Sequence, residues 1–271
     1  MSAGAAGQPD DAPRGDEPRD PRPRRLALVT GGTRGIGLAI SMRLAAVGYH
    51  VIVSSRSPQA VADAEAACRA DGGEATGIVC DVADRDSLDQ LMDTVTRQFG
   101  RLDVLVNNAG VLPRATRAER VTDDAWDEAL GINLSAPWFL ATRAHRLMKG
   151  SGGVVVNITS TAAHYPTTGL APYNVSKAGL TMLTRVLALE WARDGIRVLA
   201  VAPGKIDTDL LTPIKELVAA NTIVLNPQQR IGQPRDVADL VSFLVSDAAA
   251  YITGVVIPVD GGELLVASSD G

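Results

Sequence analysis

The feature that most constrains the fold is a repeated alternation of short, β-branched apolar runs with longer segments that have helical spacing. The apolar runs occupy residues 26–30, 50–54, 75–80, 103–107, 153–158, 196–201 and 255–259. Segments with helical spacing or good helix formers follow the first six runs, at residues 36–47, 59–70, 85–99, 124–148, 174–193 and 235–246. The runs are continuously apolar, which is typical of strands covered on both faces. The alternation therefore predicts one α/β domain, a doubly wound, seven-stranded parallel sheet flanked by helices.

The first 24 residues differ in composition from the rest of the chain. They contain five of the 15 prolines and no Val, Ile, Leu or aromatic residue. Such a segment has too little apolar surface to offset the entropy of ordering its backbone. We therefore predict a disordered tail over residues 1–24, followed by a single domain over residues 25–271.

Charge and composition argue against several classes of partner. The net charge of −5 is the wrong sign for a nucleic-acid partner, and no uncharged apolar stretch reaches the ~18 residues typical of a membrane span. Cys68 and Cys80 are too few for a disulfide framework, and no Cys or His spacing predicts a metal site. We expect reduced cysteines, a cytoplasmic location, and no nucleic-acid, membrane or metal partner.

A glycine-rich turn follows the first apolar run. In a doubly wound sheet, ligands bind beyond the carboxyl ends of the strands, at the switch in strand order. The turn Thr30-Gly31-Gly32-Thr33-Arg34-Gly35-Ile36-Gly37 leads directly into a helix, with glycines spaced Gly-x3-Gly-x-Gly. Glycines allow a tight turn and a close approach to a pyrophosphate, which the helix N-terminus favours. The alternative is an ordinary glycine-rich connection between a strand and a helix. The position of the turn directly after the first strand favours a nucleotide site over that alternative.

The residues after the second and third runs bear on the choice of cofactor. An NAD-selective site carries Asp or Glu at the end of the second strand, whereas this chain has Ser55 and Arg56 there. Arg56 and Arg34 can pair with a 2′-phosphate, which favours NADP(H) over NAD(H), the alternative being two solvated arginines. Asp81 and Val82 close the third strand and are expected near an adenine, the alternative for Asp81 being an ordinary helix cap.

Polar residues also follow the later runs. The fourth run ends in Asn107-Asn108-Ala109-Gly110, Asn133 lies within the long segment 124–148, and Ser160 follows the fifth run. Tyr173 and Lys177 are four residues apart and so share one helical face. An ammonium group and an oxidised nicotinamide near a phenol favour the phenolate, which lowers the phenol's pKa and suits it to proton transfer. The alternative is a surface Tyr–Lys pair on a packed helix.

Together these residues resemble the classical short-chain dehydrogenase/reductase family, particularly its 3-oxoacyl-carrier-protein reductase-like branch. The resemblance covers about residues 25–263. The motifs that match in chain order are the glycine turn from Thr30 to Gly37, the Asn-Asn-Ala-Gly motif at 107–110, Asn133, Ser160, Tyr173 with Lys177, the Pro203-Gly204 turn and Thr208. The resemblance implies a Rossmann-type fold and a nicotinamide cofactor.

The resemblance also implies roles for the matched residues. In a catalytic set of Asn133, Ser160, Tyr173 and Lys177, Ser160 would hold the substrate carbonyl oxygen and Tyr173 would protonate it. Lys177 would bind the nicotinamide ribose and tune Tyr173, and Asn133 would anchor a water molecule. Together with the residues argued above, the predicted cofactor contacts are Gly31, Thr33, Arg34, Gly35, Ile36, Gly37, Ser55, Arg56, Asp81, Val82, Asn107, Ala109, Gly110, Tyr173, Lys177, Pro203, Gly204, Ile206 and Thr208.

The substrate side is less constrained by sequence. The family has a lid near residues 206–230, and four apolar residues there fit a short amphipathic helix: Leu210, Leu211, Ile214 and Leu217. An apolar wall suits a ketone, an acyl chain or a polyketide-like ring. Lys205, an uncommon residue in its turn, is expected either to attract an anionic substrate or to point to solvent. His164 and Tyr165 are expected either to line the pocket or to lie at the surface.

The resemblance implies an NADP(H)-dependent oxidoreductase that interconverts a ketone and a secondary alcohol by hydride transfer. The expected activity is that of a ketoreductase on a 3-oxoacyl, polyketide-like or other apolar carbonyl substrate. The alternatives are an NAD-dependent alcohol dehydrogenase, a catalytically silent nucleotide-sensing regulator, and an isomerase or dehydratase on the same fold. Family members are commonly homotetramers, which implies assembly through segments 124–148 and 174–193.

Overall fold

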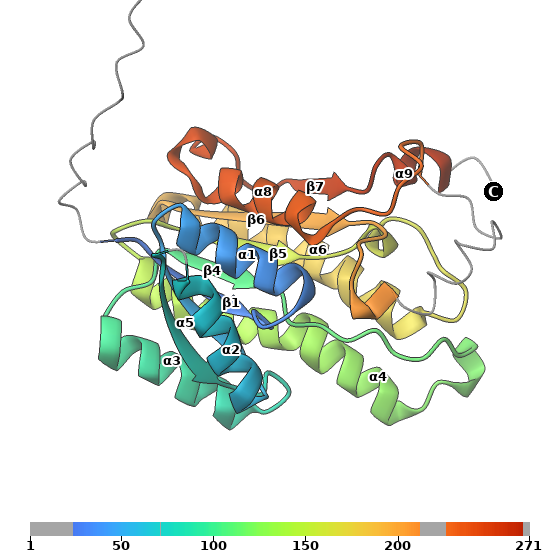
Figure 1. Ribbon diagram of the computed structural model, residues 1–271. Helices are drawn as coiled ribbons and strands as arrows, with labels where there is room; N and C mark the ends of the chain where they lie inside the picture. The colour runs from blue at the N-terminus through green and yellow to red at the C-terminus, as the bar shows by residue number, and fades with distance from the viewer. Residues whose placement is uncertain (1–23, 71, 212–225, 268–271) are drawn as a thin grey trace, which may run out of the picture.

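A seven-stranded parallel sheet forms the centre of the molecule, with helices on both faces (Figure 1). The computed structural model describes residues 24–70, 72–211 and 226–267. The strands are β1 (Leu26–Thr30), β2 (His50–Ser55), β3 (Glu74–Val79), β4 (Val104–Asn107), β5 (Gly153–Ile158), β6 (Ile196–Pro203) and β7 (Val256–Val259). Each coincides with a predicted run to within two residues at either end, so the α/β fold class is confirmed.

The strand order is β3-β2-β1-β4-β5-β6-β7, and every neighbouring pair is parallel. The direction in which successive strands are added reverses between β1 and β4. This is the topological switch point, where a crevice opens beyond the carboxyl ends of the strands. The connections after β1 and β4 therefore lie side by side at the edge where the predicted site residues gather.

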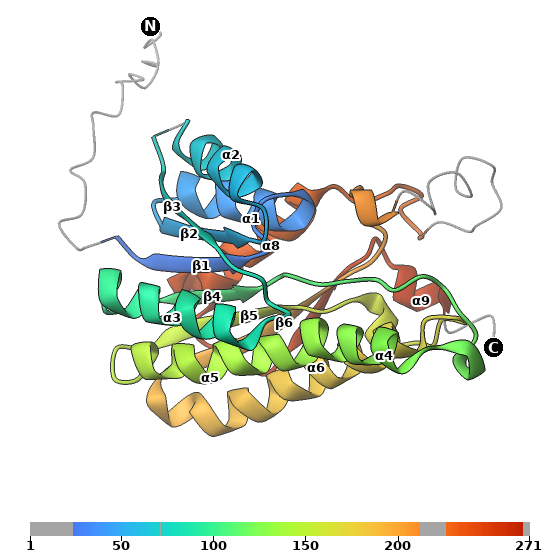
Figure 2. The same ribbon diagram turned by 90° about the horizontal axis from the view of Figure 1, so that it is seen from below.

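The helices form two layers (Figures 1 and 2). One face of the sheet carries α1 (Gly35–Ala46), α2 (Pro58–Arg69) and α8 (Pro234–Val245). The other face carries α3 (Arg85–Phe99), α4 (Asp123–Leu130), α5 (Ala136–Met148) and α6 (Ala171–Trp191). The short helix α9 (Glu263–Ala267) lies beyond the carboxyl ends of the strands. Single turns of 3₁₀ helix are η1 (Ala118–Arg120), η3 (Thr161–Ala163), η4 (Ala192–Asp194), η5 (Asp209–Leu211) and η6 (Asp247–Ala249).

Two apolar cores, one on each face of the sheet, explain the continuously apolar runs. In β1, Ala27 and Val29 face the core under α1 and α8, whereas Leu26 and Leu28 face the core under α3 and α5. Successive side chains of a strand point to opposite faces, so both sets must be apolar when both faces are covered. This packing holds the strand ends, and therefore the site, on a rigid frame.

The predicted helix 124–148 is interrupted at its centre. A π-helical segment, η2 (Gly131–Ser135), separates α4 from α5. Pro137 has no N–H to donate to the carbonyl of Asn133, so the regular hydrogen-bond ladder cannot continue through this turn. The wider turn leaves Asn133 fully buried. π-Segments of this kind occur frequently at functional sites.

Several expectations fall on residues beyond the described ranges. Residues 1–23 of the predicted tail are among them, as are Ile214 and Leu217 of the predicted lid helix. Within the lid, Leu211 is described, and its side chain is buried at the end of η5. Among the described helices, none combines the length and apolarity needed to cross a membrane.

Candidate active site

The glycine turn between β1 and α1 has the geometry of a phosphate cradle. Gly31 and Gly35 have φ angles of +61° and +51°, a left-handed conformation that favours glycine. A Cβ atom on Gly37 would lie 2.1 Å from the Gly31 carbonyl oxygen, so any side chain there would displace the turn. The N-terminus of α1 has no side-chain cap. Its first N–H groups are therefore suited to an anion such as the pyrophosphate of a nicotinamide dinucleotide.

The connection after β4 is tied to this turn. Asn108 Nδ2 donates hydrogen bonds to the carbonyl oxygens of Thr30 (2.9 Å) and Gly31 (3.1 Å). In return, Thr30 Oγ1 accepts from the backbone N–H groups of Asn108 and Ala109. From the sequence alone, Thr30 and Asn108 are members of motifs with no predicted role of their own. Their reciprocal bonding fixes the crevice at the switch point, a role that only the adjacency of β1 and β4 reveals.

Other predicted cofactor residues lie around the same turn. Thr208 Cγ2 would be 3.0 Å from a Cβ atom on Gly35, which places Thr208 against the cradle. Thr33 lies partly exposed in the turn itself, while Ile36 packs against the core. Asn107 is buried, and its Nδ2 donates to Asn157 Oδ1 at 2.9 Å. The Nδ2 group of Asn107 is thus structural, and the cofactor contact predicted for this residue is through its backbone.

At the end of β2, the predicted 2′-phosphate contacts are accessible. Ser55 is partly buried and Arg56 is exposed, and Arg56 has no carboxylate partner within the described chain. Arg34 lies on the cradle and pairs with Asp209 at 3.3 Å, with both side chains largely exposed. An exposed pair of this kind is worth at most about 1 kcal/mol, so Arg34 can exchange Asp209 for another anion.

The alternative role for Asp81, an ordinary helix cap, is wrong. Asp84 is the N-cap of α3 and accepts a hydrogen bond from the Asp86 N–H. Asp81 Oδ1 instead accepts from the Ala83 N–H at 3.0 Å and shapes the connection after β3. Val82 is partly buried against the second core. These contacts leave Asp81 free to serve the predicted adenine contact.

Asn133 fastens the connection after β4 to α6. Its Oδ1 accepts from the Val111 N–H at 2.9 Å, and its Nδ2 donates to the Val111 carbonyl and to Ser176 Oγ. A Cβ atom on Gly110 would lie 3.1 Å from Asn133 Oδ1 and 3.5 Å from Lys177 Nζ. The structure therefore brings Gly110, Asn133 and Lys177 together around one point.

Lys177 is buried beside the end of β5. Its Nζ donates to the Ile158 carbonyl at 2.9 Å and lies 5.8 Å from the centre of the Tyr173 ring. Burial lowers the pKa of Lys177 to about 8. One of its three N–H groups is used by Ile158, which leaves two for a ligand. The site thus holds an ammonium group that is charged at neutral pH but close to its titration point.

The lowering of the Tyr173 pKa by Lys177 together with an oxidised nicotinamide stays a prediction, and in the protein alone this pKa shifts upward. Burial raises the pKa of Tyr173, and a hydrogen bond with Ser160 acts in the opposite direction. The physical reason is that loss of hydration disfavours the phenolate more than its neighbours stabilise it. The interaction with Ser160 nonetheless confirms that these two hydroxyl groups are adjacent.

The segment between Ser160 and Tyr173 is held by side-chain bonds to the backbone. Ser160 Oγ accepts from the Ala162 N–H at 3.1 Å, and the Ser160 hydroxyl is also hydrogen-bonded to the Tyr173 hydroxyl. Asn174, next to Tyr173, donates from Nδ2 to the carbonyls of Ala162 (2.6 Å) and Tyr165 (2.9 Å). Sequence reasoning missed Asn174, because no motif spacing marks it.

The turn after β6 completes the edge. Pro203 ends β6, and Ile206 is buried and forms a parallel bridge with Gly232. A Cβ atom on Gly204 would lie 2.6 Å from Glu263 Oε2, so this position has no room for a side chain. The expectation that Lys205 points to solvent is wrong, because its ammonium group pairs with Glu263 and its side chain is only 17% exposed. The attraction of an anionic substrate by Lys205 stays a prediction. His164 is exposed, whereas Tyr165 is partly buried.

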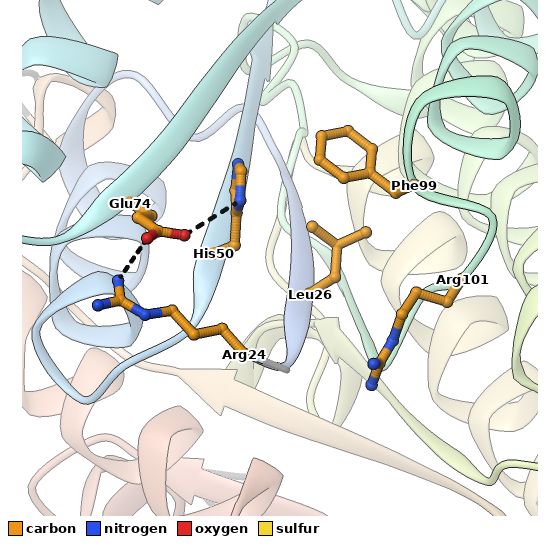
Figure 3. Close-up of a pocket in the computed structure, with 6 residues that line it drawn as sticks. All are labelled: Arg24, Leu26, His50, Glu74, Phe99 and Arg101. Carbon is orange, nitrogen blue, oxygen red and sulfur yellow. Dashed lines mark ion pairs between the residues drawn. The ribbon is translucent and has the colours of Figure 1, made fainter. Parts of the chain in front are cut away.

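A separate pocket lies at the opposite edge of the sheet, around the amino ends of β1, β2 and β3 (Figure 3). Its charged groups already have partners. Glu74 pairs with Arg24 at 3.2 Å and lies 3.5 Å from His50 Nδ1, and Arg101 pairs with Asp103. We assign this pocket no part in the site. The described residues also contain no cluster of His, Cys, Asp and Glu suited to a metal ion.

Comparison with known proteins agrees with this geometry. The sequence model of the enoyl-(acyl carrier protein) reductase family matches residues 31–263. Dehydrogenase/reductase SDR family member 4 of Oryctolagus cuniculus is 43% identical over 248 residues, covering 90% of this chain and 95% of that protein. The 3-oxoacyl-[acyl-carrier-protein] reductase of Synechocystis sp. is 42% identical over 245 residues, covering 89% and 97%. The chain belongs to the short-chain dehydrogenase/reductase family of oxidoreductases.

The solved structures give the same result. The crystal structure of a variant of actinorhodin polyketide ketoreductase with NADPH has a TM-score of 0.83 and 32% identity, covering 89% of this chain and 97% of that chain. Levodione reductase has a TM-score of 0.84 and 32% identity, covering 89% and 98%. These likenesses extend over nearly the whole of the described chain.

Proposed function

We propose that this protein is an NADP(H)-dependent ketoreductase that interconverts an apolar ketone and a secondary alcohol. The observation that carries the proposal is the grouping of Ser160, Tyr173, Lys177 and Asn133 at the same sheet edge as the glycine cradle. Two of the similar proteins, a 3-oxoacyl-[acyl-carrier-protein] reductase and a polyketide ketoreductase, support a 3-oxoacyl or polyketide-like carbonyl as substrate.

The cofactor, when bound, supplies hydride to the carbonyl carbon or accepts it in the reverse direction. When substrate binds, the O–H of Ser160 turns from the Tyr173 oxygen to the carbonyl oxygen of the substrate and holds it beside the Tyr173 hydroxyl. Tyr173 gives its proton to that oxygen as negative charge develops on it. The raised pKa of Tyr173 keeps the phenol protonated at neutral pH, as a proton donor must be.

Lys177 and Asn133 both support this proton transfer. The two N–H groups that Lys177 does not donate to Ile158 are available for the hydroxyls of the nicotinamide ribose. The positive charge of Lys177 stabilises the phenolate that Tyr173 becomes after proton transfer. Asn133 keeps the connection at Val111 against α6, which holds the neighbouring Gly110 beside Lys177.

The preference for NADP(H) over NAD(H) is supported by Arg56. Its guanidinium is exposed at the end of β2 and has no carboxylate partner within the described chain, and no Asp or Glu takes the place of Ser55. A 2′-phosphate would gain a bidentate partner there. An NAD-dependent alcohol dehydrogenase remains the second candidate function. A silent nucleotide-sensing regulator has less support, because all four predicted catalytic residues are present and grouped.

We further propose a homotetrameric assembly and a cytoplasmic location. Along α6, large apolar side chains are exposed at one helical face: Val175, Met182, Val186 and Leu189. A second exposed apolar group lies around α8, β7 and α9: Phe243, Tyr251, Val255 and Leu265. Two separate apolar faces suit a closed tetramer with two kinds of interface. The two buried, free cysteines suit a reducing compartment.

The test is oxidation of NADPH by the purified protein with a panel of ketones and 3-oxoacyl thioesters. We expect turnover of at least one apolar member, and a loss of at least about a hundredfold in kcat for Tyr173→Phe with cofactor binding retained. Turnover by Tyr173→Phe at the wild-type rate would contradict the assigned proton donor. Absence of turnover across the whole panel would contradict the ketoreductase function.

A further inference from the structure

A buried ionic cluster lies at the same edge as the predicted catalytic residues but is distinct from them. It consists of Lys205, Tyr165 and Glu263, which we call the Glu263 cluster. Glu263 Oε1 accepts from the Tyr165 hydroxyl at 2.9 Å and pairs with Lys205 Nζ. The side chains of Lys205 and Glu263 are only 17% and 8% exposed. The three residues come from the turn after β6, the segment between Ser160 and Tyr173, and the start of α9.

Stability does not account for this cluster. Removing an ammonium and a carboxylate from water costs several kcal/mol for each ion, and a buried pair often adds no net stability over apolar residues. The cost is increased here because Glu263 Oε2 is buried without a hydrogen-bond partner. A pair that is costly to bury and lies beside a reactive centre suggests a role in the chemistry of the site.

The cluster is connected to chain neighbours of the predicted catalytic and cofactor residues. Lys205 lies between Gly204 and Ile206, both predicted cofactor contacts. The Tyr165 carbonyl accepts a hydrogen bond from Asn174, the neighbour of Tyr173. Burial, with the charge of Glu263, raises the pKa of Tyr165 to about 12, so this phenol stays neutral in the cluster. The charge of the cluster therefore depends on Lys205 and Glu263 alone.

We propose that Glu263 is a specificity-determining residue that neutralises Lys205 and so restricts the site to uncharged carbonyl substrates. This inference rests on the proposed ketoreductase function and refines its substrate class. With Glu263 in place, the Lys205 ammonium is neutralised by the carboxylate that pairs with it. Without the carboxylate, the Lys205 ammonium would attract an anionic oxo acid; without the ammonium, the carboxylate would repel it.

The test compares two substrates that differ only in charge, 3-oxobutanoate and its methyl ester, in wild type, Glu263→Gln and Lys205→Met. The measured quantity is kcat/KM for the acid divided by kcat/KM for the ester, with NADPH. We expect this ratio to rise about tenfold in Glu263→Gln and to fall in Lys205→Met, because Lys205 attracts the acid once Glu263 no longer neutralises it, whereas Glu263 repels the acid once Lys205 is removed. The double variant should lie between the two.

Tyr165→Phe is the matched control, because it removes a hydrogen bond of the cluster without changing its charge. Its ratio should stay within about twofold of the wild-type value. A ratio unchanged in all the variants, even with lower rates, would make Glu263 merely structural and overturn the inference. If the wild-type protein reduces neither ketone, the proposed function is wrong for these substrates. The inference is then tested by calorimetric titration of both variants with 3-oxobutanoate. Tighter binding by Glu263→Gln than by Lys205→Met supports it, and equal affinity of the two variants overturns it.

Discussion

Lys177 is the residue at which burial and chemistry conflict most directly. Its ammonium is withdrawn from water, and burial lowers its pKa from 10.5 to about 8. Each pKa unit corresponds to about 1.4 kcal/mol, so the native state loses about 3 kcal/mol by keeping this charge. The Ile158 carbonyl is its hydrogen-bond partner within the described residues. The protein accepts this loss at the position where an ammonium can support a phenolate and bind a ribose.

The pH dependence of stability should reveal this cost. The native pKa of Lys177 is below its unfolded value, so the unfolded state binds more protons between about pH 8 and pH 10.5. The destabilisation is full below pH 8 and disappears as the pH rises through this window. The free energy of unfolding of wild type should therefore gain about 3 kcal/mol relative to Lys177→Met between pH 7 and pH 10.5. Urea unfolding at a series of pH values measures this, and a constant difference would contradict it.

Residue identities at the site could be predicted from sequence, but residue environments could not. The spacing of Tyr173 and Lys177 placed both on one face of α6, as the structure confirms. The raised pKa of Tyr173 and the pairing of Lys205 with Glu263 depend on burial by distant segments. Local sequence contains no measure of that burial, so neither effect could be predicted from it. The lowering of the Tyr173 pKa by Lys177 together with an oxidised nicotinamide stays a prediction.

At the scale of elements, the bounds of a helix could be predicted where capping residues and glycines mark its ends. Helix α3 begins after the Asp84 cap and ends at Gly100, whose φ of 65° closes it, and both bounds match the predicted 85–99. The interruption at η2 was not predicted, because Pro137 at the start of a helix is normally harmless. Pro137 interrupts the hydrogen-bond ladder only because α4 continues into α5, which places helical turns before this proline.

The glycine cradle gives a prediction at this scale. Gly37→Ala places a Cβ atom 2.1 Å from the Gly31 carbonyl oxygen, so the turn must open and the cradle is lost. We expect NADPH affinity to fall at least about tenfold, since small displacements of a binding element have large effects. Gly131→Ala is the matched control, because a Cβ atom there meets nothing within 4 Å. Dissociation constants from nicotinamide fluorescence decide the matter, and equal values for both variants would rule out the cradle.

At the scale of the whole molecule, the layered fold followed from the alternation of apolar runs and helices. The switch in strand order between β1 and β4 then determined which connections meet at the site. The apolar side chains that stay exposed on a single chain indicate where subunits could assemble. Leu189 on α6 is 82% exposed, and it continues the apolar face that begins at Val175. An exposed face of this kind is typical of an interface between subunits.

Assembly can be tested with one substitution on that face. Leu189→Asp introduces a charge at the most exposed position of the proposed interface, and we expect a tetramer to dissociate into smaller species in sedimentation experiments. Val47→Asp is the matched control, since Val47 is 46% exposed at the end of α1, far from this face. Val47→Asp should keep the wild-type mass. A wild-type protein that sediments as a monomer would contradict the proposed assembly.

The measurement that tests the account most directly is titration of the purified protein with NADPH and NADH, followed by nicotinamide fluorescence. We expect at least about tenfold tighter binding of NADPH, because Arg56 offers a 2′-phosphate an exposed guanidinium that has no carboxylate partner among the described residues. Arg56→Glu should abolish this preference, whereas Arg97→Glu, the same charge change at the far end of α3, should leave it intact. Tighter binding of NADH by the wild-type protein would contradict the assignment of NADP(H) as cofactor. Binding of neither dinucleotide would contradict the proposal that the protein is a nicotinamide-dependent enzyme.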